Sequence, residues 1–354
     1  MHKVRLFLLL SGLLSVAGLG HAQSALIDIP RQSQHALITQ RIGITDITVN
    51  YHRPLVGGRT IWGKVVPYGE VWRAGANENT TITFSDPVSV EGQPLAKGTY
   101  GLHMIPTADQ WTVIFSKTST AWGSFTYKQD EDALRVTVKP QTTEFHEALT
   151  YDFDDPKPDS TVATLRWEKV AVPFKISVDV NDIVARSLQK QLRSIAQYYW
   201  ESWDDAASYW LGTKTNLDEA LKEEDQGIRV EERFDNLMTK SSILDVLGRK
   251  DEAKAALNKA LDKANSLQLY AYGRQLQGEK KQDEAFAIYR SSAKKFPNDW
   301  GTHLGMARVY SAQGDFDNAV KEMKAALAGA PDSSKSGIES TLKHLEAKED
   351  INKL

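Results

Sequence analysis

The chain has 354 residues, no cysteine, and a formal net charge of −3 from 43 basic and 46 acidic side chains. The lack of cysteine excludes a disulfide framework, a cysteine nucleophile and a lipid anchor on cysteine. A slightly acidic chain without a basic stripe is poorly suited to bind nucleic acid or an anionic membrane, so we expect neither as a partner.

Residues 1–22 have the pattern of a secretory signal peptide. Basic residues precede an apolar run from Leu6 to Leu19, and Gly20-His21-Ala22 offers small residues for cleavage. The run is shorter than the ~20 residues that a membrane-spanning helix needs, which favours cleavage over a retained anchor. We therefore expect an exported protein of the periplasm or cell surface, with a mature N-terminus near Gln23 and no membrane span after cleavage. Residues 23–33 would form a short N-terminal segment.

Residues 34–180 show the alternation typical of β-strands. Ile47, Val49 and Tyr51 alternate with polar residues, and Gly, Pro, Asp and Asn separate runs of this kind. The further expected strands are Thr81–Phe84, Val88–Val90, Thr99–Ile105, Trp111–Phe115, Leu134–Val138, Glu144–Phe153, Val162–Trp167 and Phe174–Val180. About nine or ten short strands predict an antiparallel β-sandwich or a flattened barrel. The segment Gly92–Gly98 is expected to be a loop.

From residue 181 the apolar spacing becomes that of helices. The repeat is marked by Ala220, Ala253, Ala285 and Ala319, at intervals of 33, 32 and 34 residues, and by Pro297 and Pro331, which lie 34 residues apart. The small residues Gly273 and Ala307 mark places where a helix comes close to its neighbour. These features resemble tetratricopeptide repeats. The resemblance implies an all-α helical stack over residues 181–331, followed by a capping helix and tail over residues 332–354.

The first helix of this second half is expected to be long. Apolar residues from Ile183 to Tyr199 share helical spacing, and Asn181 or Asp182 would cap the helix. An aromatic cluster follows, made of Trp200, Trp203, Tyr209 and Trp210. These side chains would fix the helices to each other or to the sandwich, or alternatively form a groove for a partner.

Several motifs of the β-rich half resemble one family. They are Tyr51-His52-Arg53-Pro54, Gly58-Arg59, Ile61-Trp62-Gly63, Val66-Pro67-Tyr68-Gly69, Val71-Trp72-Arg73-Ala74-Gly75-Ala76-Asn77-Glu78 and Gly98-Thr99-Tyr100. They resemble a secreted bacterial family catalogued as domain of unknown function 2911, over roughly Ser33 to Val180. The resemblance implies an exported β-rich domain that can be joined to tetratricopeptide helices. It implies no particular activity.

The stretch from Val71 to Thr80 gathers polar side chains of many kinds around one glycine, next to a turn. Arg53, Arg59 and Arg73 could form a fork-shaped site for a carboxylate, sulfate or phosphate. Alternatively, Arg59 and Arg73 pair with Glu70 and Glu78 and only hold the loop. The predicted ligand-binding residues, for an anionic or sugar molecule, are Arg53, Arg59, Tyr68, Trp72, Arg73, Asn77 and Glu78.

Aromatic residues near this stretch also allow two interpretations. Trp62, Tyr68, Trp72 and Trp111 could form a stacking platform for a sugar ring, or the tryptophans could fill the core.

Signatures of catalysis or of a metal site are weak. His52, His103 and Glu78 would be metal ligands only if the strands brought them together, and no spacing is diagnostic, so we expect no metal and no cofactor. Ser85, Ser116 and Ser124 have no base beside them in the sequence.

These observations favour a non-catalytic binding protein, with a small-molecule or glycan site on the β domain and a protein partner bound by the helices. One alternative is a hydrolase whose site lies between Arg59 and Glu78, for example with Glu70 and Glu78 as a carboxylate pair. The other is a purely structural module.

Overall fold

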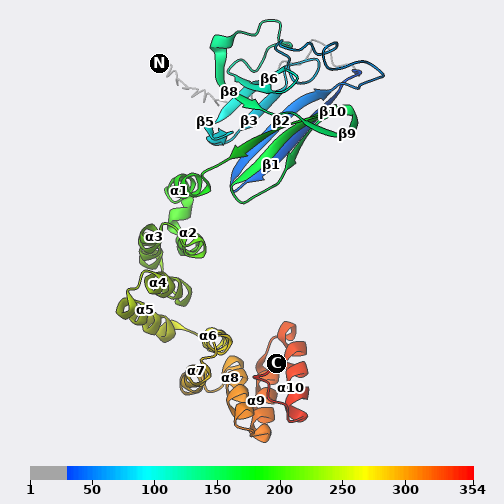
Figure 1. Cartoon of the computed structure of the whole chain (residues 1–354). Helices are drawn as coiled ribbons and strands as arrows, with labels where there is room; N and C mark the ends of the chain where they lie inside the picture. Colours follow the sequence, from blue (N-terminus) through cyan, green and yellow to red (C-terminus); the bar gives the residue numbers. More distant parts are fainter. Residues whose placement is uncertain (1–29) are drawn as a thin grey trace, which may run out of the picture. The chain divides into compact units, whose positions relative to one another are not determined.

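A computed structural model describes residues 30–354, so the predicted signal peptide, residues 1–22, lies outside the described residues. The chain divides into two compact units, of which the first ends at Ser187 and the second begins at Leu188 (Figure 1). The division falls within helix α1 (Val180–Gln191), and the boundary predicted near residue 180 coincides with the start of that helix. No helix within residues 30–354 is both long and apolar enough to cross a membrane.

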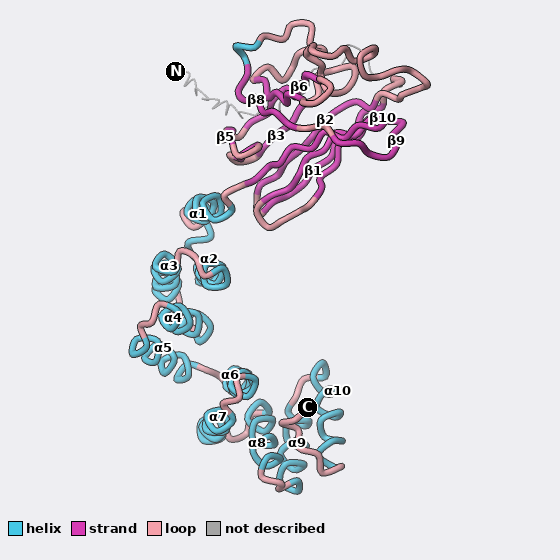
Figure 2. The backbone as a smooth tube through the Cα atoms, in the orientation of Figure 1, coloured by secondary structure: helices cyan, strands magenta, loops and turns pink. Residues whose placement is uncertain are grey.

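The N-terminal unit consists of two antiparallel sheets, which Figure 2 shows in magenta. Their strands are β1 (Gln34–Ile42), β2 (Thr45–Arg53), β3 (Thr81–Phe84), β4 (Val88–Val90), β5 (Gln93–Leu95), β6 (Gly98–Pro106), β7 (Trp111–Ser116), β8 (Asp132–Val138), β9 (Gln141–Asp154) and β10 (Ser160–Ser177). The six-stranded sheet has the order β1-β2-β3-β6-β7-β8, and the four-stranded sheet has the order β5-β4-β10-β9. The predicted antiparallel sandwich is confirmed.

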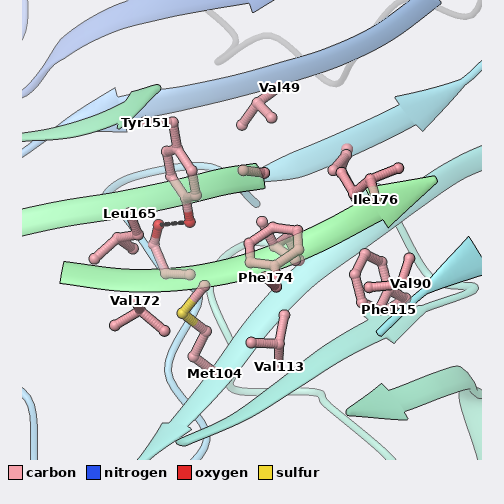
Figure 3. Packing of buried hydrophobic residues seen from close by; sticks show 14 of the residues in the cluster. Val49, Val90, Met104, Val113, Phe115, Tyr151, Leu165, Val172, Phe174 and Ile176 are labelled. Atoms are coloured by element: carbon pink, nitrogen blue, oxygen red, sulfur yellow. Dashed lines mark hydrogen bonds between the residues drawn. The ribbon is translucent and has the colours of Figure 1, made fainter. Parts of the chain in front are cut away.

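The core lies between the two sheets because alternate side chains of each strand point inward. In β2, Ile47, Val49 and Tyr51 are buried, whereas the residues between them are partly exposed. Phe115 of one sheet meets Phe174 of the other edge to face, with ring centroids 6.0 Å apart (Figure 3). The alternation read from the sequence therefore reflects burial on one face of each strand.

Three details of the predicted strands differ from the structure. No strand was predicted at β1, which spans Gln34–Ile42. The expected loop Gly92–Gly98 contains the short strand β5, and Pro94 is tolerated there because β5 is an edge strand. The runs Val162–Trp167 and Phe174–Val180 belong largely to one strand, β10. Its pairing with β9 shifts register around Glu168, which has a φ of 55°, so the bulge interrupts the period without ending the strand.

The C-terminal unit is a stack of helices, drawn in cyan in Figure 2, and the predicted all-α stack is confirmed. After α1 and a 3₁₀ turn (Ile195–Tyr198), the helices are α2 (Trp200–Thr213), α3 (Leu217–Val230), α4 (Phe234–Val246), α5 (Lys250–Lys263), α6 (Ser266–Gly278), α7 (Gln282–Lys295), α8 (Trp300–Ala312), α9 (Phe316–Gly329) and α10 (Asp332–Glu346). The first helix is shorter than predicted, since it ends at Gln191 and not at Tyr199.

Buried small residues account for the 33-residue repeat. Ala220, Ala253, Ala285 and Ala319 are all at most 5% exposed.

Three helices meet at Tyr289 of α7, whose side chain is 1% exposed. A Cβ atom added to Gly273 of α6 would overlap the Tyr289 ring, and one added to Gly305 of α8 would lie 2.7 Å from Cδ1 of that ring. The close approach of the Tyr289 ring to α6 and α8 therefore requires glycine at both positions. The sequence predicts such a close approach for Gly273.

Acidic side chains are buried where α2, α3 and α4 meet. Glu224 is fully buried, and burial, reinforced by the negative charge of Asp204, raises its pKa to about 9. Burial also raises the pKa of Glu223 to about 7. The positive charge of Lys240 opposes the rise in the pKa of Glu224, and its ammonium group also pairs with Asp225 at 2.6 Å. Glu224 is therefore protonated at neutral pH.

Replacing Gly273 with alanine should destabilise the helical unit although alanine favours helices. Overlap with the Tyr289 ring should cost about 1–3 kcal/mol of unfolding free energy. Gly278 lies in the same helix with open space around its Cα, so Gly278→Ala should be neutral or gain up to about 1 kcal/mol. Urea unfolding of both variants measures the difference, and equal stabilities would contradict the packing at Tyr289.

Replacing Glu224 with glutamine should flatten the pH dependence of stability. Because its folded pKa of about 9 lies above the ordinary value of 4.5, the folded state holds a proton that the unfolded state releases as pH rises between these values. Stability therefore falls over this range in the parent and should fall less in Glu224→Gln. Urea unfolding at several pH values checks this. Asp218→Asn, which changes an exposed carboxylate of the same helix, should keep the parental slope.

Candidate functional site

The loop from Val71 to Thr80 is held by both sheets. Trp72 and Met104 of β6 exchange two backbone hydrogen bonds of 2.8 Å. The carbonyl oxygen of Ala74 accepts a hydrogen bond of 2.9 Å from the hydroxyl of Tyr151 in β9, the dashed line of Figure 3. Ala74 and Asn77 have φ values of 50° and 58°. Residues other than glycine seldom adopt this left-handed backbone conformation. Long-range contacts therefore determine the conformation of this loop.

A cavity of about 500 Å³ opens on one side of this loop, and we call it the arginine cavity. Its walls include three of the predicted ligand-binding residues, Arg59, Trp72 and Arg73, together with the buried Trp167. No acidic side chain lines it among the described residues. The backbone N–H of Gly57, a residue of the cavity wall, donates a hydrogen bond of 2.8 Å to Oε1 of Glu147, which lies outside the wall.

Arginines of the cavity wall bind backbone carbonyls. Arg73 donates from Nη1 to the carbonyl of Asn77 at 2.8 Å, and Arg59 donates from Nε to the carbonyl of Val56 at 3.1 Å. Burial lowers the pKa of Arg73, and the charge of Glu78 opposes this in part. The carboxylate of Glu78 itself contacts Arg31 at 3.5 Å and His52 at 3.3 Å. Within residues 30–354, neither Arg59 nor Arg73 forms an ion pair.

Tryptophans cluster beside this cavity, and two of them, Trp72 and Trp167, line it. Trp62 meets Trp111 edge to face at 5.0 Å, and Trp72 stacks on Trp167 at 5.9 Å. Trp111 and Trp167 are at most 2% exposed, and the indole N–H of Trp167 has no hydrogen-bond partner. Trp111 thus belongs to the core, and Trp62 and Trp72 are partly buried and pack against it, which agrees with the second of the two interpretations.

The remaining predicted site residues lie apart from the arginine cavity. Arg53 donates from Nε to the carbonyl of Leu149 at 3.1 Å. Tyr68 is 51% exposed and its ring covers Gly63. Asn77 donates from Nδ2 to the carbonyl of Ser33 at 3.3 Å. The structure therefore groups Arg59, Trp72 and Arg73, and whether any of the seven residues binds a ligand stays a prediction.

Glu78 lines a second cavity, of about 310 Å³, which we call the histidine cavity. Its other walls include His35, His52, Asn79 and Trp122. Burial lowers the pKa of His52, while the charge of Glu78 opposes the shift. His35 and Trp122 were not among the predicted site residues, because they are remote in sequence from the Val71–Thr80 stretch and carry no motif.

One serine does have a base beside it. The hydroxyl of Ser124 lies 2.9 Å from Nδ1 of His103, although 21 residues separate them. His103 is 2% exposed, and burial lowers its pKa to about 4, so its imidazole is neutral at physiological pH. Neither residue lines either cavity. The described residues contain no group of three or more His, Asp or Glu side chains placed to hold a metal ion.

The helical unit carries a groove of about 420 Å³ between α4, α5 and α6. Its walls combine apolar residues, such as Met238 and Leu257, with charged ones, such as Asp245 and Lys254. A surface of this composition can contact both side chains and backbone of an extended segment.

Comparison with known proteins agrees with this two-part organisation. Residues 33–176 match the family described as "Protein of unknown function (DUF2911)". Residues 234–262 and 276–336 match tetratricopeptide repeat models, whereas the predicted repeat unit around Ala220 lies outside both matches. The search of curated proteins found no match.

Among solved structures, one similar chain is YrrB, described as a TPR protein with an unusual peptide-binding site. It is 15% identical, with a TM-score of 0.27, over 47% of this chain and 87% of that chain. The N-terminal domain therefore resembles the DUF2911 family and the C-terminal helices resemble tetratricopeptide repeats, as the sequence motifs predict.

Proposed function

We propose that this chain is a non-catalytic binding protein, whose β domain takes an anionic small molecule in the arginine cavity and whose helices bind a protein partner. The observation that carries the first part is the state of Arg73. This residue is half-buried, is part of the cavity wall, and forms no ion pair within the described residues. A buried charge without a counterion is costly, so a site of this kind favours a ligand that supplies the missing negative charge.

Hydrogen-bonding groups at the cavity match an anion. Two residues of the wall, Arg59 and Arg73, carry guanidinium groups that only donate, and a third, Trp167, carries a buried indole N–H without a partner. Arginine binds carboxylate, sulfate and phosphate through parallel N–H groups. A volume of about 500 Å³ is within the range of sites for small organic molecules.

The second part of the proposal concerns the helices. Their match to tetratricopeptide repeats supports a protein-interaction module, because such stacks present extended surfaces to partners. The groove between α4, α5 and α6 is the candidate contact surface, since it joins apolar and charged walls. An extended peptide segment of the partner would fit this chemistry best.

Export belongs to the same proposal. The basic and apolar pattern of residues 1–22 supports secretion to the periplasm or cell surface. N-terminal sequencing of the protein from the cell envelope should then begin near Gln23. A chain from that fraction that still begins at Met1 would contradict cleavage.

Anions should stabilise the protein through Arg73. At a ligand concentration of roughly a hundred times Kd, binding adds about 2.7 kcal/mol to the unfolding free energy. Sulfate, phosphate and citrate are the probes, compared with chloride at matched ionic strength, and thermal or urea unfolding of the full chain is the measurement. Arg73→Gln should remove most of the anion-specific gain.

The matched control is Arg41→Gln, which removes an exposed arginine of β1 that pairs with Asp46. It should keep the gain of the parent protein. If Arg73→Gln retains the full gain, or if none of the anions stabilises the parent beyond chloride, the arginine cavity is not the binding site. This result would favour a hydrolase or a purely structural module over a binding protein.

A further inference from the structure

Two residues in the wall of the histidine cavity each carry a buried side-chain oxygen that has no hydrogen-bond partner. These oxygens are Oε2 of Glu78 and Oδ1 of Asn79, and Asn79 is only 8% exposed. Oε2 of Glu78 is 3.3 Å from Nε2 of His52, but this contact is not a hydrogen bond. Because a buried acceptor without a partner costs free energy, a side-chain rotation that turned either oxygen toward a hydroxyl in the cavity would be favourable.

Charges around the cavity favour a neutral donor. Arg31 lies 3.5 Å from Oε1 of Glu78 and offsets its negative charge, and the positive charge of Arg73 also acts on His52. An ammonium group entering the cavity would therefore meet positive charge as well as the carboxylate. Hydroxyl groups donate without carrying charge, so they suit Glu78 and Asn79 better.

An aromatic side chain stands at the edge of this cavity. Trp122 is 49% exposed, and the guanidinium of Arg31 lies 5.4 Å from the centre of its ring. An exposed indole beside free polar acceptors offers both an apolar surface and hydrogen bonds. A pyranose ring has matching features, because its C–H groups can pack on an indole while its hydroxyls donate at the rim.

We propose that the histidine cavity binds a neutral carbohydrate ring, with Trp122 packing on the ring and with Glu78 and Asn79 accepting hydrogen bonds from its hydroxyls. Its volume of about 310 Å³ is at the lower end for ligand sites, which suits a single ring or the end of a chain. This site is separate from the arginine cavity, since the two have no lining residue in common. It therefore does not depend on anion binding.

The test uses saturation-transfer NMR on the full chain with the methyl pyranosides of glucose, galactose, mannose and N-acetylglucosamine. At least one sugar should receive saturation on its ring protons. Trp122→Ala and Glu78→Gln should each weaken its binding about tenfold or more. Phe125→Ala is the control, because Phe125 is an 83% exposed aromatic residue on the same loop and does not line the cavity. It should bind as the parent does.

The proposal is overturned if none of these sugars binds to the folded parent, or if Trp122→Ala and Phe125→Ala bind equally well. Binding of ethylammonium in place of the sugars would likewise overturn it, in favour of a cation site. Sulfate stabilisation, measured in parallel, should persist in Trp122→Ala. Failure of the sugar site is thereby distinguished from failure of the anion site.

Discussion

The hydrogen bond from Tyr151 to the carbonyl of Ala74 is the contact on which the rest of the site depends. It ties a loop with unfavourable φ values to β9, while Trp72 ties the same loop to β6 of the other sheet. Strained backbone persists only where its surroundings impose it, and here two sheets supply that constraint. The core of the sandwich consequently positions the loop, and the hydrogen bond from Arg73 to the carbonyl of Asn77 supports it from within.

The two cavities beside this loop have opposite hydrogen-bonding character. The first wall carries the donors of Arg59, Arg73 and Trp167, whereas the second carries buried oxygens of Glu78 and Asn79 that have no hydrogen-bond partner. Arg73 lines the arginine cavity and Glu78, five positions later, lines the histidine cavity, so one short stretch supplies a donor to one wall and an acceptor residue to the other. This separation is why we assign an anion to one cavity and a neutral donor to the other.

Much of the fold could be predicted because burial leaves a period in the sequence. The alternation in β2 and the alanines of the helical repeat are both direct consequences of one-sided burial. The strand β5 was missed because Pro94 and the flanking glycines are typical of a loop. Within the site, Arg59, Trp72 and Arg73 could be selected because they are close in sequence. Trp122 could not be predicted as a residue of the histidine cavity, because it is remote in sequence from the Val71–Thr80 stretch. The contact of Ser124 with His103 could not be predicted either, because 21 positions separate the two residues.

The packing at Tyr289 has a consequence for how the helical unit can change over evolution. The ring fills space that Cβ atoms would otherwise occupy on two neighbouring helices, at Gly273 and Gly305. A larger residue at either glycine meets the ring, and a smaller residue at 289 leaves a void against both glycines. Exchange of any one of the three residues alone therefore passes through a destabilised intermediate. The three positions should vary together among related chains, as a single unit of covariation spanning three helices.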